Sequence, residues 1–242
     1  MSDDPGGWST SAEAWIAAQG ESGDRGRRLI LDGPMLARVR QAAPRTALDV
    51  GCGEGRFCRM LSADGIDATG IDPTPALLAE ARRRDPDGRY IEAAAEALPF
   101  GDASFDLTVS YLTLIDIEDI AAAIAEMARV TRPGGRILVA NLTGLITANP
   151  NFGWIDGPDG KRLFAIDHYL EERPNRAEWD GISVINWHRP LSTYMAHFLA
   201  AGLTLTHFDE PAPTAGDPAW IDIAVRAPWF LVMEWQKPEA PR

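Results

Sequence analysis

Short apolar runs alternate with amphipathic segments through the middle of the chain, and this alternation predicts the fold. Five runs have the length and apolar character of buried strands, at residues 47–50, 66–71, 89–93, 105–111 and 136–141. The segments between them place apolar residues at helical spacing. One predicted helix, over about 117–131, has an apolar face made of Ile117, Ile120, Ile124 and Met127. Strands and helices that alternate in this way predict an α/β fold with a mostly parallel sheet covered by helices on both faces.

Two segments do not follow the alternation. Residues 1–43 precede the first strand and carry apolar residues at roughly helical spacing, so we expect an N-terminal helical arm. Its Trp15 and Ile16 either fold over a ligand site or pack on the sheet. Residues 142–188 hold the turn signal 157–160 between two strand-like runs. This segment is rich in aromatic residues, namely Phe152, Trp154, Phe164, Tyr169, Trp179 and Trp187.

An interruption as long as 142–188 inside a compact domain is usually functional, so we expect a lid and not a second domain. After it, the pattern predicts a helix over 191–201 that stops at Gly202, and a strand over 203–208. A proline-rich loop then leads to a last strand over 229–235. The chain shows no internal repeat.

Charge and composition narrow the functional class. The 242 residues carry a formal net charge of −12, which argues against nucleic acid as a partner. No stretch approaches eighteen apolar residues and the first residues lack a signal region, so we expect a cytoplasmic protein without a membrane partner. Cys52 and Cys58 are the two cysteines, and a bridge between them would distort the segment around residue 53. The four histidines show no metal-ligand spacing, and we expect no metal site.

Three glycines follow the first predicted strand and predict a ligand-binding turn. Gly51, Gly53 and Gly55 let the backbone approach a ligand closely, because no Cβ stands in the way. A dinucleotide-binding loop requires a further glycine three positions after the second one, where this chain has Arg56. Asp49 and Glu54 flank the turn and favour a cationic ligand over a diphosphate. An NAD-dependent dehydrogenase is therefore disfavoured.

The second strand ends in a carboxylate. Asp72 lies about twenty residues beyond the turn, where an acidic residue can bind both hydroxyls of a ribose. Thr74 and Pro75 follow, and they predict the capping residue and the first residue of the next helix.

These motifs resemble those of class I S-adenosylmethionine-dependent methyltransferases, of the small-molecule type related to the ubiquinone/menaquinone C-methyltransferases. Five motifs in register over roughly residues 45–141 carry the resemblance: 48–55 (LDVGCGEG), 70–73 (GIDP), 95–100 (AEALPF), 104–106 (SFD) and 129–135 (RVTRPGG). The resemblance implies a Rossmann-like, doubly wound, seven-stranded sheet whose last strand is antiparallel. It also divides a single domain, 1–242, into the arm (1–43), a cofactor-binding half (44–141), the lid (142–188) and a C-terminal part (189–242).

The resemblance further implies S-adenosyl-L-methionine as the cofactor. The residues expected to contact it are Asp49, Gly51, Cys52, Gly53, Gly55, Asp72, Pro73, Ala95, Glu96, Tyr111 and Leu112. Many relatives place an aspartate before the alanine that contacts adenine, but this chain has Ala94 there. The adenine amino group is then left to bond Glu96 or water.

Tyr111 and His188 are the residues expected to take part in the chemistry. Tyr111 follows the fourth strand and would flank both the methionine part of the cofactor and the substrate mouth. His188 precedes the helix expected over that mouth, in a His-Arg-Pro-Leu-Ser segment that resembles one in small-molecule O- and N-methyltransferases. It would act as a general base for a hydroxyl acceptor, or would only orient a carboxylate or an amine.

The expected activity is methyl transfer, by in-line displacement, to an O, N or C nucleophile of a small-molecule acceptor. Two alternatives keep the cofactor: a rearrangement, decarboxylation or cyclisation on the same fold, and a non-catalytic subunit that binds the cofactor and serves a partner. Fold does not identify the acceptor. The sequence is compatible with a monomer or a homodimer.

Overall fold

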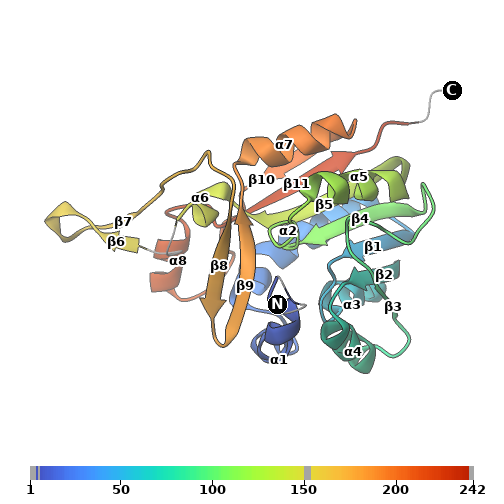
Figure 1. Cartoon of the computed structure of the whole chain (residues 1–242), viewed down its shortest axis with the longest axis horizontal. Coiled ribbons are helices and arrows are strands. Elements are labelled where there is room, and N and C mark those ends of the chain that lie inside the picture. The colour runs from blue at the N-terminus through green and yellow to red at the C-terminus, as the bar shows by residue number, and fades with distance from the viewer. Residues whose placement is uncertain (1–3, 5, 150–153, 240–242) are drawn as a thin grey trace.

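The computed structural model describes residues 4, 6–149 and 154–239. Phe152 of the predicted lid, and both ends of the predicted 1–242 domain, lie outside these ranges. A seven-stranded sheet forms the centre, in the order β10-β11-β5-β4-β1-β2-β3 (Figure 1). Its strands are β1 (Thr46–Val50), β2 (Asp67–Asp72), β3 (Arg89–Glu92), β4 (Phe105–Tyr111), β5 (Thr131–Leu142), β10 (Thr204–Asp209) and β11 (Phe230–Gln236).

The strand directions confirm the predicted sheet. Strands β1 to β5 pair in parallel, whereas β11 pairs antiparallel with both β5 and β10. The last strand is thus inserted between two others. Parallel strands point their carboxyl ends to one edge, so the loops after β1, β2 and β4 meet there.

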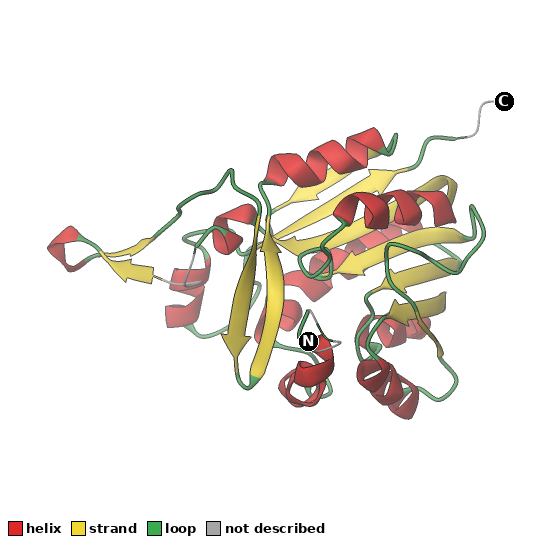
Figure 2. Ribbon diagram, viewed as in Figure 1, coloured by secondary structure: helices red, strands yellow, loops and turns green. Residues whose placement is uncertain are grey.

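Helices cover both faces of the sheet, as Figure 2 shows. Alternate residues of β5 face opposite sides: Ile137 and Val139 pack with α5 (Ile120–Val130) and α7 (Leu191–Ala200). Leu138 and Ala140 pack in the second core, to which α2 (Asp32–Ala42) and α3 (Arg56–Ala63) contribute. Helix α4 (Pro75–Arg84) lies beside α3, where its Leu78 packs near Cys58. This double cover confirms the predicted layers.

Four local features differ from the expected pattern. Helix α5 begins at Ile120, because the Asp119 carboxylate accepts a 3.0 Å hydrogen bond from the Ala122 N–H; residue 117 is left in a loop. The Thr74 side chain makes no capping bond, although Pro75 is at the first turn of α4. Residues 133–135 lie within β5, at a register shift in its pairing with β4. A short helix, α8 (Pro218–Ala224), occupies the proline-rich loop.

The N-terminal arm is helical, as predicted. It comprises α1 (Trp8–Gln19), a π-helical turn η1 (Arg27–Leu31) and α2. Trp15 does not pack on the central sheet: its ring lies edge-on to Trp8, with centroids 5.1 Å apart, and to Trp179, 6.4 Å apart. The arm therefore joins the core through η1 and α2, while α1 lies against the later hairpin.

The segment 142–188 forms α6 (Gly144–Thr147) and two hairpins outside the central sheet. In the first, β6 (Trp154–Asp156) and β7 (Arg162–Phe164) flank η2 (Pro158–Gly160), which confirms the predicted turn. It extends away from the rest of the chain in Figure 1. In the second, β8 (Arg173–Trp179) pairs with β9 (Ile182–His188), and β9 packs on α1. Within the described ranges, each helix is too short or too polar to cross a membrane.

Candidate active site

The glycine turn lies at the carboxyl end of β1 and faces a hollow. Gly51 and Gly53 have φ angles of 73° and 54°, which favour glycine. A Cβ on Gly51 would lie 2.1 Å from Thr113 Cγ2, so the turn packs tightly against the loop after β4. A Cβ on Gly53 would meet only Trp15 Nε1, at 3.8 Å. The Gly53 backbone is therefore open to a ligand.

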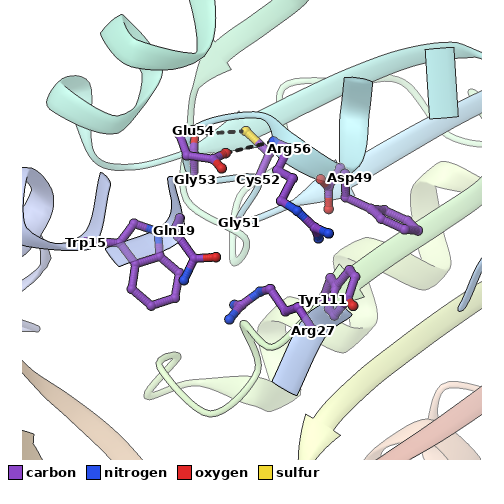
Figure 3. Close-up of a pocket in the computed structure, with 11 residues that line it drawn as sticks. Trp15, Gln19, Arg27, Asp49, Gly51, Cys52, Gly53, Glu54, Arg56 and Tyr111 are labelled. Carbon is purple, nitrogen blue, oxygen red and sulfur yellow. Dashed lines mark hydrogen bonds between the residues drawn. The ribbon is translucent and has the colours of Figure 1, made fainter. Parts of the chain in front are cut away.

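A cavity of about 680 Å³ opens beside this turn, a size typical of small-ligand sites. Its walls come from the ends of β1, β2 and β4, the N-terminal arm and β9. A smaller hollow of about 50 Å³ adjoins it and shares Trp15, Arg27, Gly51, Gly53 and Tyr111. In Figure 3, Trp15, Gln19 and Arg27 of the arm face the turn that carries Gly51 and Gly53. The arm thus forms one wall of the site.

Asp72 ends β2 at the wall of the larger cavity and is almost buried. Its Oδ2 accepts a 2.9 Å hydrogen bond from the Gly53 N–H, and its Oδ1 accepts one of 2.9 Å from the Thr74 N–H. Burial raises the pKa of Asp72, while these backbone hydrogen bonds oppose the rise. Each carboxylate oxygen has capacity for a further hydrogen bond, so Asp72 can accept from two hydroxyls.

Asp49 lies at the bottom of the smaller hollow and is buried. Its Oδ2 is 3.5 Å from the Cys58 thiol, and its Oδ1 has no hydrogen-bond partner among the described residues. Burial raises the pKa of Asp49 to about 7, and the nearby charges of Asp72 and Glu54 add to the rise, against the effect of the Cys58 thiol. The charge of Arg27 also opposes the rise, but Asp49 Oδ1 has no bonded partner among the described residues, and a buried carboxylate without a bonded cation is costly. This site is therefore suited to a positively charged ligand.

Tyr111 ends β4 and Leu112 follows it, and both line the larger cavity. The Tyr111 hydroxyl donates a 2.8 Å hydrogen bond to Asp32, and burial together with that carboxylate raises the pKa of Tyr111. Leu112 has a φ of 60°, a strained conformation for a leucine that is frequent at functional sites. Arg27 lies over the rings of Trp15 and Tyr111, at 4.9 and 5.7 Å from their centroids. Sequence reasoning had not identified Arg27, which no motif marks.

The other residues expected at the cofactor fall into two groups. Pro73, Ala95 and Glu96 line the larger cavity beside Ala94, and Cys52 lines the smaller one. Gly55 is not among the described residues that line either hollow. A Cβ there would lie 2.6 Å from the Tyr90 ring, so Gly55 is needed for packing at the start of α3.

His188 is fully buried and is not among the described residues that line the cavity. Its Nδ1 is 2.7 Å from the Thr147 hydroxyl and its Nε2 is 2.9 Å from the Tyr169 carbonyl oxygen. The carbonyl can only accept, so Nε2 donates and Nδ1 accepts from the hydroxyl. Burial lowers the pKa of His188. Both ring nitrogens are engaged within the protein, and this geometry does not support the expected role as a general base.

A carboxylate that the sequence analysis had not identified lies in the loop after β4. Asp116 lines the larger cavity, and its Oδ1 accepts a 2.6 Å hydrogen bond from the Asn186 amide on β9. Burial raises the pKa of Asp116 well above its ordinary value. Its position beyond the carboxyl end of a parallel strand was the available signal, because ligands of α/β sheets bind at that edge.

The site fits S-adenosylmethionine, whose sulfonium and ammonium are cationic and whose ribose carries two hydroxyls. Asp49 offers an unpartnered buried oxygen, and Asp72 offers spare acceptor capacity at the end of β2. The open backbone at Gly53 leaves room for close approach.

Comparison with known proteins agrees with this fit. A family profile described as a methyltransferase domain matches residues 48–139. Demethylmenaquinone methyltransferase from Beutenbergia cavernae is 38% identical over 96 residues, 40% of either chain. Malonyl-[acyl-carrier protein] O-methyltransferase from Serratia marcescens is 42% identical over 95 residues, 39% of this chain and 37% of that protein. The chain thus matches about two-fifths of the length of these curated relatives.

Solved structures match over more of the chain. An S-adenosylmethionine-dependent methyltransferase from Mesorhizobium loti superposes with a TM-score of 0.74 at 28% identity, over 83% of this chain and 96% of that one. A putative enzyme of the same description from Listeria monocytogenes gives a TM-score of 0.75 at 24% identity, over 86% and 98%, and shows the fold. The chain therefore contains a class I S-adenosylmethionine-dependent methyltransferase domain. S-adenosylmethionine is the cofactor of this class.

Proposed function

We propose that the protein transfers the methyl group of S-adenosylmethionine to an O, N or C nucleophile of a small-molecule acceptor. One observation carries the proposal: a cavity of about 680 Å³ extends from the cofactor turn to the arm and the β8–β9 hairpin. That space is enough for a ligand beside the cofactor. The sulfonium already activates the methyl group, so the protein has to align an acceptor with the carbon–sulfur bond and exclude water.

The geometry supports the following cofactor contacts. Asp72 accepts from the two ribose hydroxyls, and the Gly51–Gly53 backbone borders the methionine part. Asp49 lies near the cationic end, and Arg27, which faces the same hollow, pairs with the methionine carboxylate. Pro73, Ala95 and Glu96 border the adenine, with Ala94 leaving its amino group to Glu96 or water.

The arm and the second hairpin close the acceptor side. Trp8 and Trp15 on α1, and Ile185 and Trp187 on β9, line the larger cavity. The backbone N–H of Trp187 donates a 2.6 Å hydrogen bond to the Ile115 carbonyl, which holds β9 against the loop after β4. Of the two hairpins in the predicted lid, β8–β9 is therefore the one that lines the cavity. The projecting β6–β7 hairpin contributes no described residue to that lining.

Titration calorimetry with S-adenosylmethionine, S-adenosylhomocysteine and NAD tests the cofactor assignment: the first two are expected to bind, and NAD is not. Methyl transfer is then tested by incubating acceptor panels with methyl-labelled cofactor and following label in the products. Cofactor binding with a chemical change of an acceptor but no label transfer would favour a non-methylating reaction.

A further inference from the structure

The acceptor side of the cavity is strongly acidic. Of the charged residues that line the larger cavity within the described ranges, the one basic residue is Arg27, and the acidic ones are Asp4, Asp72, Glu96, Asp116 and Glu118. Arg27 lies over the rings of Trp15 and Tyr111 and lines both hollows, and its charge acts on Asp49 and on Asp116. Among the described residues, the acidic side chains on the cavity wall thus outnumber the basic one.

The contacts of these carboxylates show which are available to an acceptor. Asp72 and Glu96 lie on the adenosine side. Asp4 accepts hydrogen bonds of 2.8 and 2.9 Å from the Thr10 N–H and hydroxyl at the start of α1. Asp116 and Glu118 remain, both in the loop between β4 and α5.

Asp116 is held as a fixed acceptor. Its Oδ1 accepts from Asn186, the indole of Trp8 also hydrogen bonds its carboxylate, and its own N–H donates 2.8 Å to the Thr113 carbonyl. The buried guanidinium of Arg189 also fixes this loop, because it donates a 2.8 Å hydrogen bond to the Ile117 carbonyl. A carboxylate held by neutral amide and indole donors keeps its capacity to pair with a cation.

Apolar and aromatic surface surrounds this carboxylate. Trp8 and Trp187 are half-buried and line the cavity, together with Ile117 and Ile185. Indole faces attract cations as well as apolar groups. The same space therefore offers a charge partner and a surface for a carbon skeleton.

We propose that the acceptor is an amine with an apolar or aromatic body, bound as its ammonium by Asp116 between the indoles of Trp8 and Trp187. The inference rests on the proposed methyl transfer. An anionic acceptor would lie against the carboxylates of Asp116 and Glu118.

The step balances without a further reactant. The ammonium gives one proton to Asp116, which leaves a neutral amine with a lone pair. The nitrogen forms a bond to the methyl carbon while the carbon–sulfur bond breaks and its electron pair stays on sulfur, yielding S-adenosylhomocysteine and a methylated ammonium. The positive charge passes from sulfur to nitrogen, and the proton on Asp116 leaves to solvent as the product departs.

The test compares acceptors that differ only in the reacting group. The protein loaded with S-adenosylhomocysteine is titrated with 2-phenylethylamine, 2-phenylethanol and 3-phenylpropionate, and then with the corresponding indole compounds. Methyl transfer to each is measured with labelled S-adenosylmethionine. We expect the amines to bind at least tenfold more tightly than their alcohol and carboxylate partners, and to be the methylated members.

Variants locate the effect. Asp116→Asn, which keeps the shape and the hydrogen-bonding group facing Asn186, should weaken amine binding at least tenfold and methylation at least a hundredfold while leaving S-adenosylhomocysteine affinity within twofold. Asp87→Asn is the matched control, because Asp87 is exposed and lies in the loop before β3. This variant should change neither amine binding nor methylation.

The outcomes separate the two proposals. Equal or better binding of the carboxylates or alcohols, or full amine binding by Asp116→Asn, overturns the amine inference and leaves methyl transfer in place. Absence of S-adenosylmethionine binding overturns the proposed function itself.

Discussion

The Oδ2 atom of Asp72 accepts a 2.9 Å hydrogen bond from the backbone N–H of Gly53, and this bond joins the ends of two neighbouring strands. The residue expected to hold the ribose therefore also fixes the turn expected to border the methionine. One carboxylate shapes two parts of the cofactor site.

Replacing Asp72 by alanine should weaken S-adenosylmethionine binding at least tenfold. The change removes two charge-assisted hydrogen bonds to the ribose, each contributing roughly 1.5–3 kcal/mol, and releases the turn. Titration calorimetry measures the effect. Asp67→Ala, an exposed substitution at the start of the same strand, is the control. Unchanged affinity in Asp72→Ala would contradict the assignment.

Cofactor affinity should depend on pH through Asp49. Because burial raises its pKa to about 7, the free protein holds Asp49 neutral below that pH and ionised above it. A bound cation favours the ionised form, so binding below pH 7 requires loss of a proton. Affinity should then fall as the pH is lowered, by up to about tenfold per unit. Calorimetry across this range measures the slope, and Asp49→Asn should flatten it; an equally steep slope in that variant would exclude Asp49 as its source.

Gly51 and Gly53 should respond differently to alanine. Both have positive φ, which costs an alanine about 1–2 kcal/mol. At Gly51 the new methyl would also overlap Thr113, adding about 1–3 kcal/mol, so Gly51→Ala should lower the melting temperature markedly. At Gly53 the methyl enters open space, so cofactor affinity should fall more than stability does. Paired melting and binding curves distinguish the two, and equal losses of stability would be the contrary result.

His188→Ala should reduce stability by about 1–3 kcal/mol, because it leaves the Thr147 hydroxyl and the Tyr169 carbonyl without their partner. Denaturant unfolding measures the loss, with exposed His168→Ala as the control. Once a substrate is known, the acidic limb of its pH–rate curve should persist in His188→Ala. Loss of that limb with a hundredfold fall in turnover would restore the histidine as a general base.

Acid should destabilise the protein in part through Glu234 of β11. Burial raises the pKa of this carboxyl, but hydrogen bonds from Arg38 and Thr206 and the charges of Arg136 and Arg38 outweigh that effect and lower it. The stabilisation is present above the unfolded pKa of about 4.3 and is lost as the pH falls towards the lower folded value. Glu234→Gln should be less stable by about 2 kcal/mol near neutral pH, since its partners are partly exposed, and the difference should shrink in acid. A difference that grows in acid would contradict this reading of the site.

The sequence predicted those parts of the molecule that depend on local pattern. Apolar runs located β1, β2 and β4 to within about a residue, because a buried parallel strand leaves an uninterrupted apolar signal. The turn at Gly51 and the position of Asp72 followed from fixed spacing. Helix α8 was missed because its signal, Asp217 capping a Pro-Ala-Trp segment, is short and lies among prolines.

Contacts between distant segments were the part that could not be predicted. Asp116 meets Asn186 across seventy residues, and this pairing depends on how the β8–β9 hairpin docks. His188 likewise looked accessible from its neighbours in sequence, but α6 supplies Thr147 to its ring. Strand alternation along β9 gives no account of which partner each side chain meets. The residues on the acceptor side of the site could therefore be identified only from the structure.

The insertion of β11 between β5 and β10 sets the order in which the protein can assemble on the ribosome. Strand β10 has β11 as its partner in the sheet and does not touch β5 through the ladder. While residues 230–236 remain in the exit tunnel, β5 presents an open edge and β10 has no place to pair. A nascent chain therefore holds an unpaired strand until residues 230–236 emerge, and this interval is when chaperones would matter most.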